Sequence, residues 1–204
     1  MKIIDIIGAG GHTRSSLNIL KENFRDYTYN IFDDSFCIKN NEYIHGIKIV
    51  GRVSSITRKN KIFLSIGDNK QRSIYFEKFN KWIIRENLFH KTCYCEEEIN
   101  FGIANQIYAN VYINSYVNIG NDNIINTSAI LEHEVSIGNH NHISVDVKLC
   151  GRVKVGNNCM IGANTTVRDK IFICDDVIIG AGSVVVKDIL EKGIYVGVPA
   201  RKIK

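Results

Sequence analysis

A six-residue rhythm dominates this chain from Phe101 to about Val186. An aliphatic residue returns at every sixth position without a break, and a small residue, a β-branched residue or an Asn precedes each of them by two positions. The aliphatic positions are Ile107, Ile113, Ile119, Ile125, Leu131, Ile137, Ile143, Leu149, Val155, Ile161, Val167, Ile173, Ile179 and Val185. Neither the period of an α-helix nor the alternation of an ordinary strand produces this spacing.

A strict hexapeptide repeat is typical of a parallel β-helix whose flat faces are each one hexad long. We expect the aliphatic residue and the small residue two positions before it to point into the prism, while the residues between them face outward. Three hexads make one coil, and each coil buries its core only against the coils beside it. The pattern therefore predicts a left-handed parallel β-helix, with the tail after Val186 capping its open end.

The chain before the repeat has a different pattern. Residues 2–7 read as a buried strand, and a glycine turn at residues 8–11 and a helical pattern follow it. Further strands are expected at residues 27–32 and 61–66, with a second helix at residues 70–80. A strand, a glycine turn and a helix open a nucleotide-binding α/β unit. We therefore predict a Rossmann-like nucleotide-binding domain at residues 1–95 and a β-helix domain at residues 96–204.

The glycine turn and two aspartates are the candidate ligand contacts of the first domain. Gly10 and Gly11 would let a ligand approach the backbone at the start of the helix, and His12 follows them. Asp33 and Asp34 follow the second strand, where α/β nucleotide sites contact a ribose or a base. Thr13 stands where a dinucleotide-binding turn has its third glycine. A tight structural turn and a plain acidic loop remain the alternatives.

Composition narrows the possible functions. The net charge of +5 is too small to indicate nucleic-acid binding but suits small anionic ligands. The six cysteines follow no disulfide or zinc spacing, so we expect free thiols in a reducing compartment. The N-terminal residues do not resemble a signal peptide, and no apolar run is long enough to span a bilayer. We therefore expect a cytoplasmic protein without membrane insertion.

His133 is the leading catalytic candidate. Glu134 follows it near a corner of the predicted prism, and a carboxylate beside an imidazole fixes its tautomer and raises its basicity. One coil further along lies Gly151, whose missing side chain would leave a hollow beside the histidine. The length of one coil also places Arg152 beside Glu134, and Lys170 beside Arg152. This basic column would either meet phosphates or form a salt-bridged exposed face.

A zinc site is the weaker alternative. His133, His140 and His142 all fall in the repeat, and carbonic anhydrases are built on the same kind of prism. Their spacing here does not resemble the ligand set of that enzyme. We therefore predict no metal.

Motifs across almost the full chain resemble those of bacterial sugar acyltransferases of the sialic acid O-acetyltransferase family. They are also similar to those of the N-acetyltransferase that acts on a UDP-linked 4-amino-4,6-dideoxy sugar in the bacillosamine pathway. The motifs are Gly8-Ala9-Gly10-Gly11-His12, Phe32-Asp33-Asp34, Ile66-Gly67-Asp68-Asn69, Asn126-Thr127-Ser128, Glu132-His133-Glu134 and Gly197-Val198-Pro199-Ala200-Arg201. After His12, this chain has Thr13 and Arg14 where Gly-Lys is commoner in proteins of this family.

The resemblance implies a role for each matching residue. His133 would be the general base, and Glu134 would raise its basicity. The residues implied to contact acetyl-CoA are Asn126, His142, Gly151, Ala163 and Ala181. The residues implied to line the nucleotide-sugar pocket are Gly10, Gly11, His12, Asp33 and Asp34.

The reaction implied is direct transfer of acetyl from acetyl-CoA to the amine of a nucleotide-linked (UDP- or dTDP-) 4-amino-4,6-dideoxy sugar, for surface glycan synthesis. The resemblance also implies a homotrimer with the coenzyme between adjacent helices, because a single prism without a long insertion has nothing to wall the site. A sugar or sialic acid O-acetyltransferase is the alternative, since one imidazole serves either nucleophile. A non-catalytic sugar-binding prism is a third hypothesis.

Overall fold

A computed structural model describes residues 2–37, 42–57 and 59–204 of the chain. The chain divides into two compact units after Arg85, ten residues before the expected boundary at residue 95. The difference has a simple cause, because strand β6 (Leu88–Phe89) already pairs in parallel with β9 (Gln106–Ile107) of the β-helix. The first coil therefore begins before the hexad rhythm becomes visible in the sequence.

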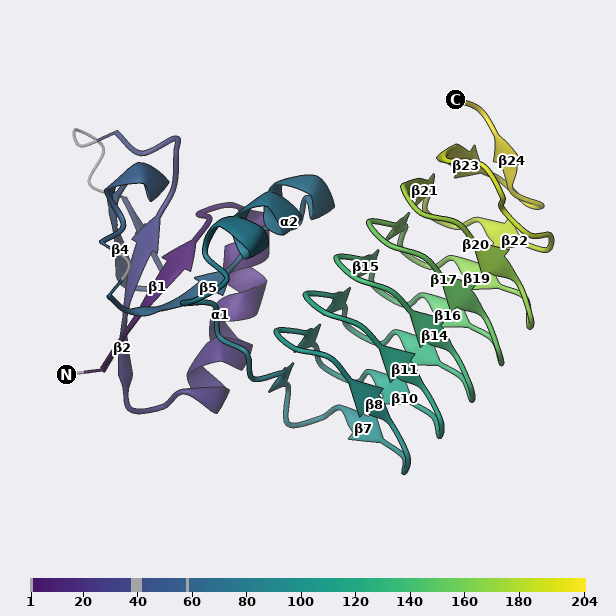
Figure 1. Cartoon of the computed structure of the whole chain (residues 1–204), viewed down its shortest axis with the longest axis horizontal. Coiled ribbons are helices and arrows are strands. Elements are labelled where there is room, and N and C mark those ends of the chain that lie inside the picture. Colours follow the sequence, from purple (N-terminus) through teal and green to yellow (C-terminus); the bar gives the residue numbers. More distant parts are fainter. Residues whose placement is uncertain (1, 38–41, 58) are drawn as a thin grey trace. The chain divides into compact units, whose positions relative to one another are not determined.

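The first unit is a small α/β domain with a sheet of strand order β3-β4-β2-β1-β5 (Figure 1). Its strands are β1 (Lys2–Ile7), β2 (Tyr27–Phe32), β3 (Tyr43–Ile44), β4 (Ile47–Gly51) and β5 (Lys61–Leu64). Its helices are α1 (Gly11–Asn23), α2 (Asn69–Lys78) and the short 3₁₀ helix η2 (Val53–Ser55). β1 lies in the centre and pairs in parallel with both β2 and β5. The Rossmann-like domain predicted from the glycine turn is therefore confirmed.

Burial explains why the central strand is rich in isoleucine. Ile4, Ile6 and Ile7 are almost fully buried, as expected for a parallel strand covered on both faces. The antiparallel hairpin of β3 and β4 was not predicted. Its turn is formed by His45 and Gly46, both with positive φ, which is the backbone that a tight hairpin requires.

The second unit is a β-helix with three flat faces (Figure 1). The first face contains β7 (Tyr94–Cys95), β10 (Tyr112–Ile113), β13 (Ile130–Leu131), β16 (Lys148–Leu149), β19 (Thr166–Val167) and β22 (Val184–Val185). The second face contains β8 (Asn100–Phe101), β11 (Asn118–Ile119), β14 (Ser136–Ile137), β17 (Lys154–Val155) and β20 (Phe172–Ile173). The third face contains β6, β9, β12 (Ile124–Ile125), β15 (His142–Ile143), β18 (Met160–Ile161), β21 (Val177–Ile179), β23 (Gly193–Val196) and β24 (Arg201–Lys202).

The interior of the prism matches the repeat. Every aliphatic position of the hexads is at most 4% exposed, and every position two residues before it is at most 2% exposed. The prediction that both positions point inward is therefore confirmed. After the last hexad, Ile189 joins the same core, and Tyr195 and Ala200 pack against it, so the tail closes this end as expected.

Each coil turns at three edges of the prism. The first edge joins the first face to the second, the second edge joins the second face to the third, and the third edge joins the third face back to the first. At each turn from residue 104 to residue 176, one non-glycine residue has a φ between 53° and 63°. This left-handed backbone makes the sharp corner. From Asp122 to Asp176 the N–H of the corner residue bonds to a carbonyl of the preceding coil, as Glu134 does to Ser115 (3.1 Å).

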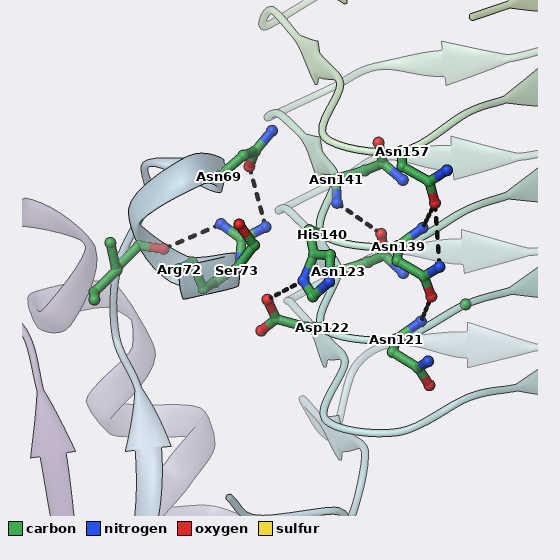
Figure 2. Close-up of polar contacts among 12 residues, drawn as sticks. Asn69, Arg72, Ser73, Asn121, Asp122, Asn123, Asn139, His140, Asn141 and Asn157 are labelled. Atoms are coloured by element: carbon green, nitrogen blue, oxygen red, sulfur yellow. Dashed lines mark hydrogen bonds and ion pairs between the residues drawn. The ribbon is translucent and has the colours of Figure 1, made fainter. Parts of the chain in front are cut away.

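Two asparagine ladders hold the second edge together (Figure 2). Inside the prism, the Oδ1 of Asn105 accepts a bond from the backbone N–H of Asn123 (2.8 Å), while the Nδ2 of Asn123 donates to the carbonyl of Gly138 (2.9 Å). An outer ladder of Asn121, Asn139 and Asn157 repeats the pattern closer to solvent. Asparagine at the inward position thus replaces aliphatic packing with bonds to backbone that would otherwise lie unpaired.

No helix formed by the described residues has the length and apolar character needed to cross a membrane.

Candidate active site

The first unit contains a cavity of about 460 Å³ at the carboxyl ends of β1, β2 and β5. All five residues predicted for the nucleotide-sugar pocket line it, namely Gly10, Gly11, His12, Asp33 and Asp34. Sequence reasoning missed other lining residues, among them Ser65, Gln71 and Tyr75. The carboxyl ends of parallel strands are where open α/β sheets bind their ligands.

The glycine turn forms one wall of this cavity. Gly8 has a φ of +111°, and a Cβ there would lie 2.5 Å from the carbonyl oxygen of Ser65, so only glycine fits. By contrast, a Cβ on Gly10 or Gly11 would meet nothing within 4 Å. Gly11 begins α1, and no side chain caps this end of the helix. The first N–H groups of α1 therefore suit an anion in the cavity.

Thr13 has a structural role in the turn. Its side chain is fully buried, and its Oγ1 donates to the carbonyl of Gly8 at 2.9 Å. The hydroxyl thus ties the start of α1 to the end of β1 at the position where a dinucleotide-binding turn has a glycine. Arg14 lies one turn into the helix and donates to the carbonyl of Gly10 at 3.2 Å.

Asp33 and Asp34 hold the opposite wall in place. Asp33 accepts a bond from the backbone N–H of Ala9 (2.7 Å), which fixes the glycine turn against β2. Asp34 accepts bonds from the N–H of Val53 (3.2 Å) and the hydroxyl of Tyr75 (2.7 Å). Burial first, and then the bond to Asp34, raise the pKa of Tyr75 to about 12. Tyr75 therefore stays a neutral hydroxyl on the cavity wall.

Helix α2 and the loop before it complete the cavity. The loop contributes Ile66 and Gly67. Arg72 of α2 donates to the carbonyl of Ile66 (3.2 Å) and to the Oδ1 of Asn69 (3.0 Å) (Figure 2). Asp68 caps the helix by accepting a bond from the N–H of Gln71. Arg72 was not singled out in the sequence, because no periodic pattern links an arginine in a helix to a carbonyl in the loop before it.

His133 and Glu134 lie on the first edge of the prism. The Nδ1 of His133 is 3.0 Å from the Oε2 of Glu134. A Cβ on Gly151 would lie only 2.6 Å from the Cε1 and Nε2 of His133, so the ring occupies the space that a side chain there would fill. The neighbours expected from the length of one coil are therefore present. The carboxylate favours a proton on Nδ1, which leaves Nε2, beside Gly151, to act as a base.

Arg152 shares Glu134 with the histidine. Its Nε donates to the same Oε2 atom at 3.0 Å. The hydrogen bond with His133 and the charge and hydrogen bond of Arg152 hold the pKa of Glu134 below its ordinary value. Glu134 therefore stays ionised at neutral pH. All three side chains are close to half exposed, at 44% for His133, 49% for Glu134 and 48% for Arg152, so a substrate can reach them.

The other residues expected at the coenzyme lie elsewhere on the prism. His142 points outward from the third face, where its Nε2 is 3.3 Å from the Nδ2 of Asn126. Asn126, Ala163 and Ala181 lie along the third edge, with the N–H of Gly182 bonded to the carbonyl of Ala163. Of the five residues, only Gly151 lies beside His133. Within one chain the first face separates the two groups.

His140 belongs to neither group. On the second edge, its Nδ1 lies 2.8 Å from the Oδ2 of Asp122 one coil earlier (Figure 2). Throughout residues 2–37, 42–57 and 59–204, no group of three His, Cys, Asp or Glu side chains is arranged to hold a metal ion.

Both units match known protein families. Residues 3–79 match the PglD N-terminal domain, and residues 134–169 and 152–187 match the bacterial transferase hexapeptide repeat. A search of curated proteins gave no match.

Solved structures resemble the whole chain. A variant of perosamine N-acetyltransferase from Caulobacter crescentus, with one histidine replaced by asparagine and in complex with CoA and GDP-perosamine, is 27% identical. It has a TM-score of 0.88, and the match covers 100% of this chain and 97% of that one. The acetyltransferase domain of PglB from Neisseria gonorrhoeae is 22% identical to this chain. It has a TM-score of 0.90, and the match covers 100% of each chain.

Proposed function

We propose that this chain, a hexapeptide-repeat acyltransferase with a PglD N-terminal domain, acetylates the amino group of a nucleotide-linked amino sugar with acetyl-CoA as donor. The resemblance to bacterial sugar acyltransferases is confirmed by the family matches and by the likeness to perosamine N-acetyltransferase over the full chain. The finer proposal is a UDP- or dTDP-linked 4-amino-4,6-dideoxy sugar for surface glycan synthesis. The observation that carries the catalytic proposal is the His133–Glu134 pair beside Gly151.

In the proposed reaction His133 acts as the general base. Its Nε2 takes a proton from the amine while the nitrogen attacks the thioester carbonyl. The new C–N bond forms, the C–S bond breaks, and the coenzyme thiolate leaves and is protonated, with no acyl-enzyme. Glu134, bonded to Nδ1, stabilises the imidazolium that forms during the step. A base on a rigid edge, with its ring packed against Gly151, also supplies the positioning on which direct transfer depends.

The cavity of the first unit is the proposed site for the nucleotide sugar. The start of α1, where no side chain caps the helix, suits the diphosphate, and Gly10, Gly11 and His12 line the cavity at this point. Asp33 and Asp34 supply acceptor oxygens on the opposite wall for the ribose or the base. Their bonds to Ala9 and to Tyr75 keep these oxygens in place.

The proposed active form is a homotrimer. The base lies on the first edge of the prism, whereas Asn126, His142, Ala163 and Ala181 lie on the third edge and the third face. A rotational symmetry operation that sets the first edge of one chain against the third edge of the next would unite these residues around one acetyl-CoA molecule.

A panel of acceptors tests the function. We would incubate the protein with acetyl-CoA and UDP-, dTDP-, GDP- and CMP-linked sugars carrying either an amino or a hydroxyl group, together with free sialic acid. The expected result is a mass gain of one acetyl group on an amino sugar linked to UDP or dTDP. Acetylation of GDP-linked amino sugars alone would correct the nucleotide. Acetylation of sialic acid with none on any amino sugar would establish the O-acetyltransferase alternative instead.

A further inference from the structure

A cleft of about 440 Å³ lies next to the proposed base and has no role in the site described so far. Arg152, Lys154, Lys170, Ile171 and Phe172 line it. Three of these five side chains are cations, on a protein whose net charge is only +5. The cleft therefore concentrates positive charge in one hollow of the β-helix.

Backbone pairing fixes the position of this cleft relative to His133. The N–H of Arg152 bonds to the carbonyl of His133 (2.9 Å), and the N–H of Lys170 bonds to the carbonyl of Gly151 (2.9 Å). Arg152 and Lys170 therefore follow the base on the next two coils, about 5 Å apart along the prism. On the second face, Lys154 pairs in register with Phe172.

The two lysines are available to a ligand. Neither Lys154 nor Lys170 forms an ion pair or a side-chain hydrogen bond with any residue that the structure describes, and both are exposed. The nearby carboxylate of Asp188 accepts a bond from the backbone N–H of Phe172 (2.9 Å). Both lysines line the same cleft as Arg152, so one anion bound there can contact more than one cation.

Arg152 connects the cleft to the base. Its Nε is bonded to Glu134, and a guanidinium carries two further nitrogen atoms with four N–H donors. These terminal donors can bind an anion in the cleft while Nε remains on the carboxylate. Arg152 thus contacts both Glu134 and the cleft, so replacing it would disturb the proposed base as well. Replacing Lys154 and Lys170 tests the cleft without changing a residue bonded to Glu134.

We infer that Arg152, Lys154 and Lys170 form a phosphate-binding subsite beside the base, an inference that rests on the proposed acetyl transfer between two phosphorylated substrates. Lysine binds phosphate as a point charge and arginine as a planar fork, so the set suits a diphosphate. Phe172, whose side chain is 40% exposed, gives the cleft an apolar part that suits an organic group attached to the diphosphate. The diphosphate belongs either to acetyl-CoA or to the nucleotide sugar, and kinetics distinguish these two sources.

The kinetic test uses the Lys154→Met and Lys170→Met variants, singly and together. Lys192→Met is the matched control, because Lys192 is an exposed lysine outside the cleft. Each cleft variant is expected to raise the KM of one substrate roughly three- to fivefold, the size of an exposed charge contact, while kcat changes little. The substrate whose KM rises is the source of the diphosphate. Salt should raise that KM in the parent more than in the double variant.

A binding titration separates this inference from the proposed function. Calorimetry with CoA and with inorganic pyrophosphate needs no turnover. If the protein acetylates none of the acceptors but the double variant loses affinity for these probes, the subsite stands and the proposed function fails. If the protein acetylates an amino sugar while both variants keep the parent KM values and affinities, the subsite is overturned. Failure of the parent to bind either probe would overturn it as well.

Discussion

At the scale of single residues, one carboxylate oxygen organises the proposed catalytic group. The Oε2 of Glu134 is bonded to both His133 and Arg152. The length of one coil was enough to predict that Gly151 and Arg152 lie beside this pair, because a parallel β-helix places successive coils in register. The bond between Tyr75 and Asp34 could not be predicted in this way, since no repeat relates two residues that meet through the packing of an α/β domain.

Replacing the proposed base should abolish most turnover. His133→Ala is expected to lower kcat by roughly 10²–10⁴-fold, the usual contribution of a general base, without loss of folding because the side chain is exposed. Steady-state kinetics measure the loss, and circular dichroism checks the fold. His90→Ala is the control, because the Nδ1 of His90 is bonded locally to Thr92 and His90 has no part in the proposed site. A His133→Ala enzyme as fast as the parent would remove His133 from the mechanism.

The pH profile tests Arg152. Because the pKa of Glu134 is lowered, its carboxylate is charged throughout the neutral range. It loses this negative charge only as the pH falls through the lowered pKa. In Arg152→Met the carboxylate of Glu134 loses its bond to the arginine and keeps its bond to His133. The guanidinium that repels the imidazolium is also removed, so the protonated form of His133 is favoured. The acidic limb of kcat against pH should therefore move to higher pH.

The surroundings of His133 make this comparison specific to Arg152. Other charged groups on the first edge include Glu132, which is bonded to Asn114, Glu97 and Glu98 two coils before, and Asp169 and Lys170 two coils further on. None of them is changed in Arg152→Met. Arg152→Lys keeps the charge and should keep most of the profile. An acidic limb that stays in place in Arg152→Met would show that the arginine does not influence the base.

At the scale of secondary-structure elements, the hexad repeat predicted the β-helix because each inward position is defined by its neighbours on adjacent coils. Strands β1 and β2 of the first unit were predicted because each is six residues long and ends in buried apolar residues. The hairpin of β3 and β4 was missed because its strands are short and partly exposed. The domain boundary was placed too late because the first coil contains Leu88 and Phe89 without the later rhythm.

The inner asparagine ladder should contribute more to the free energy of unfolding than the outer one. Asn123→Ala removes a fully buried amide and leaves the carbonyl of Gly138 without its bond, so we expect a loss of about 1–3 kcal/mol in unfolding free energy. Asn139→Ala is the matched change in the outer ladder, where water can replace the amide, and should cost under about 1 kcal/mol. Denaturant unfolding at equal protein concentration measures both. Equal losses would mean that burial does not set the value of these bonds.

At the scale of the whole molecule, the proposal divides the work between the two units. Gly11→Val places a side chain into the cavity of the first unit, where a Cβ has no neighbour within 4 Å, so the fold should tolerate it. The KM of the nucleotide sugar should rise at least roughly tenfold, as expected when a bulky group fills a ligand site. The KM of acetyl-CoA should not change. An equal rise for both substrates would contradict the division.

The proposed trimer builds each site from two chains, and a mixing experiment tests it. His133→Ala removes the base from the first edge, and Ala163→Trp obstructs the third edge, where the coenzyme is proposed to lie. Each variant alone should be inactive.

When the two variants are co-expressed, a site built from the intact first edge of one chain and the intact third edge of its neighbour regains function. Random assembly gives about a quarter of the parent activity, because both edges are intact in one neighbouring pair out of four. A site contained within one chain would regain none, since every chain carries one of the two defects. Sedimentation of the parent should give the mass of three chains, and a monomer with full activity would refute the shared site.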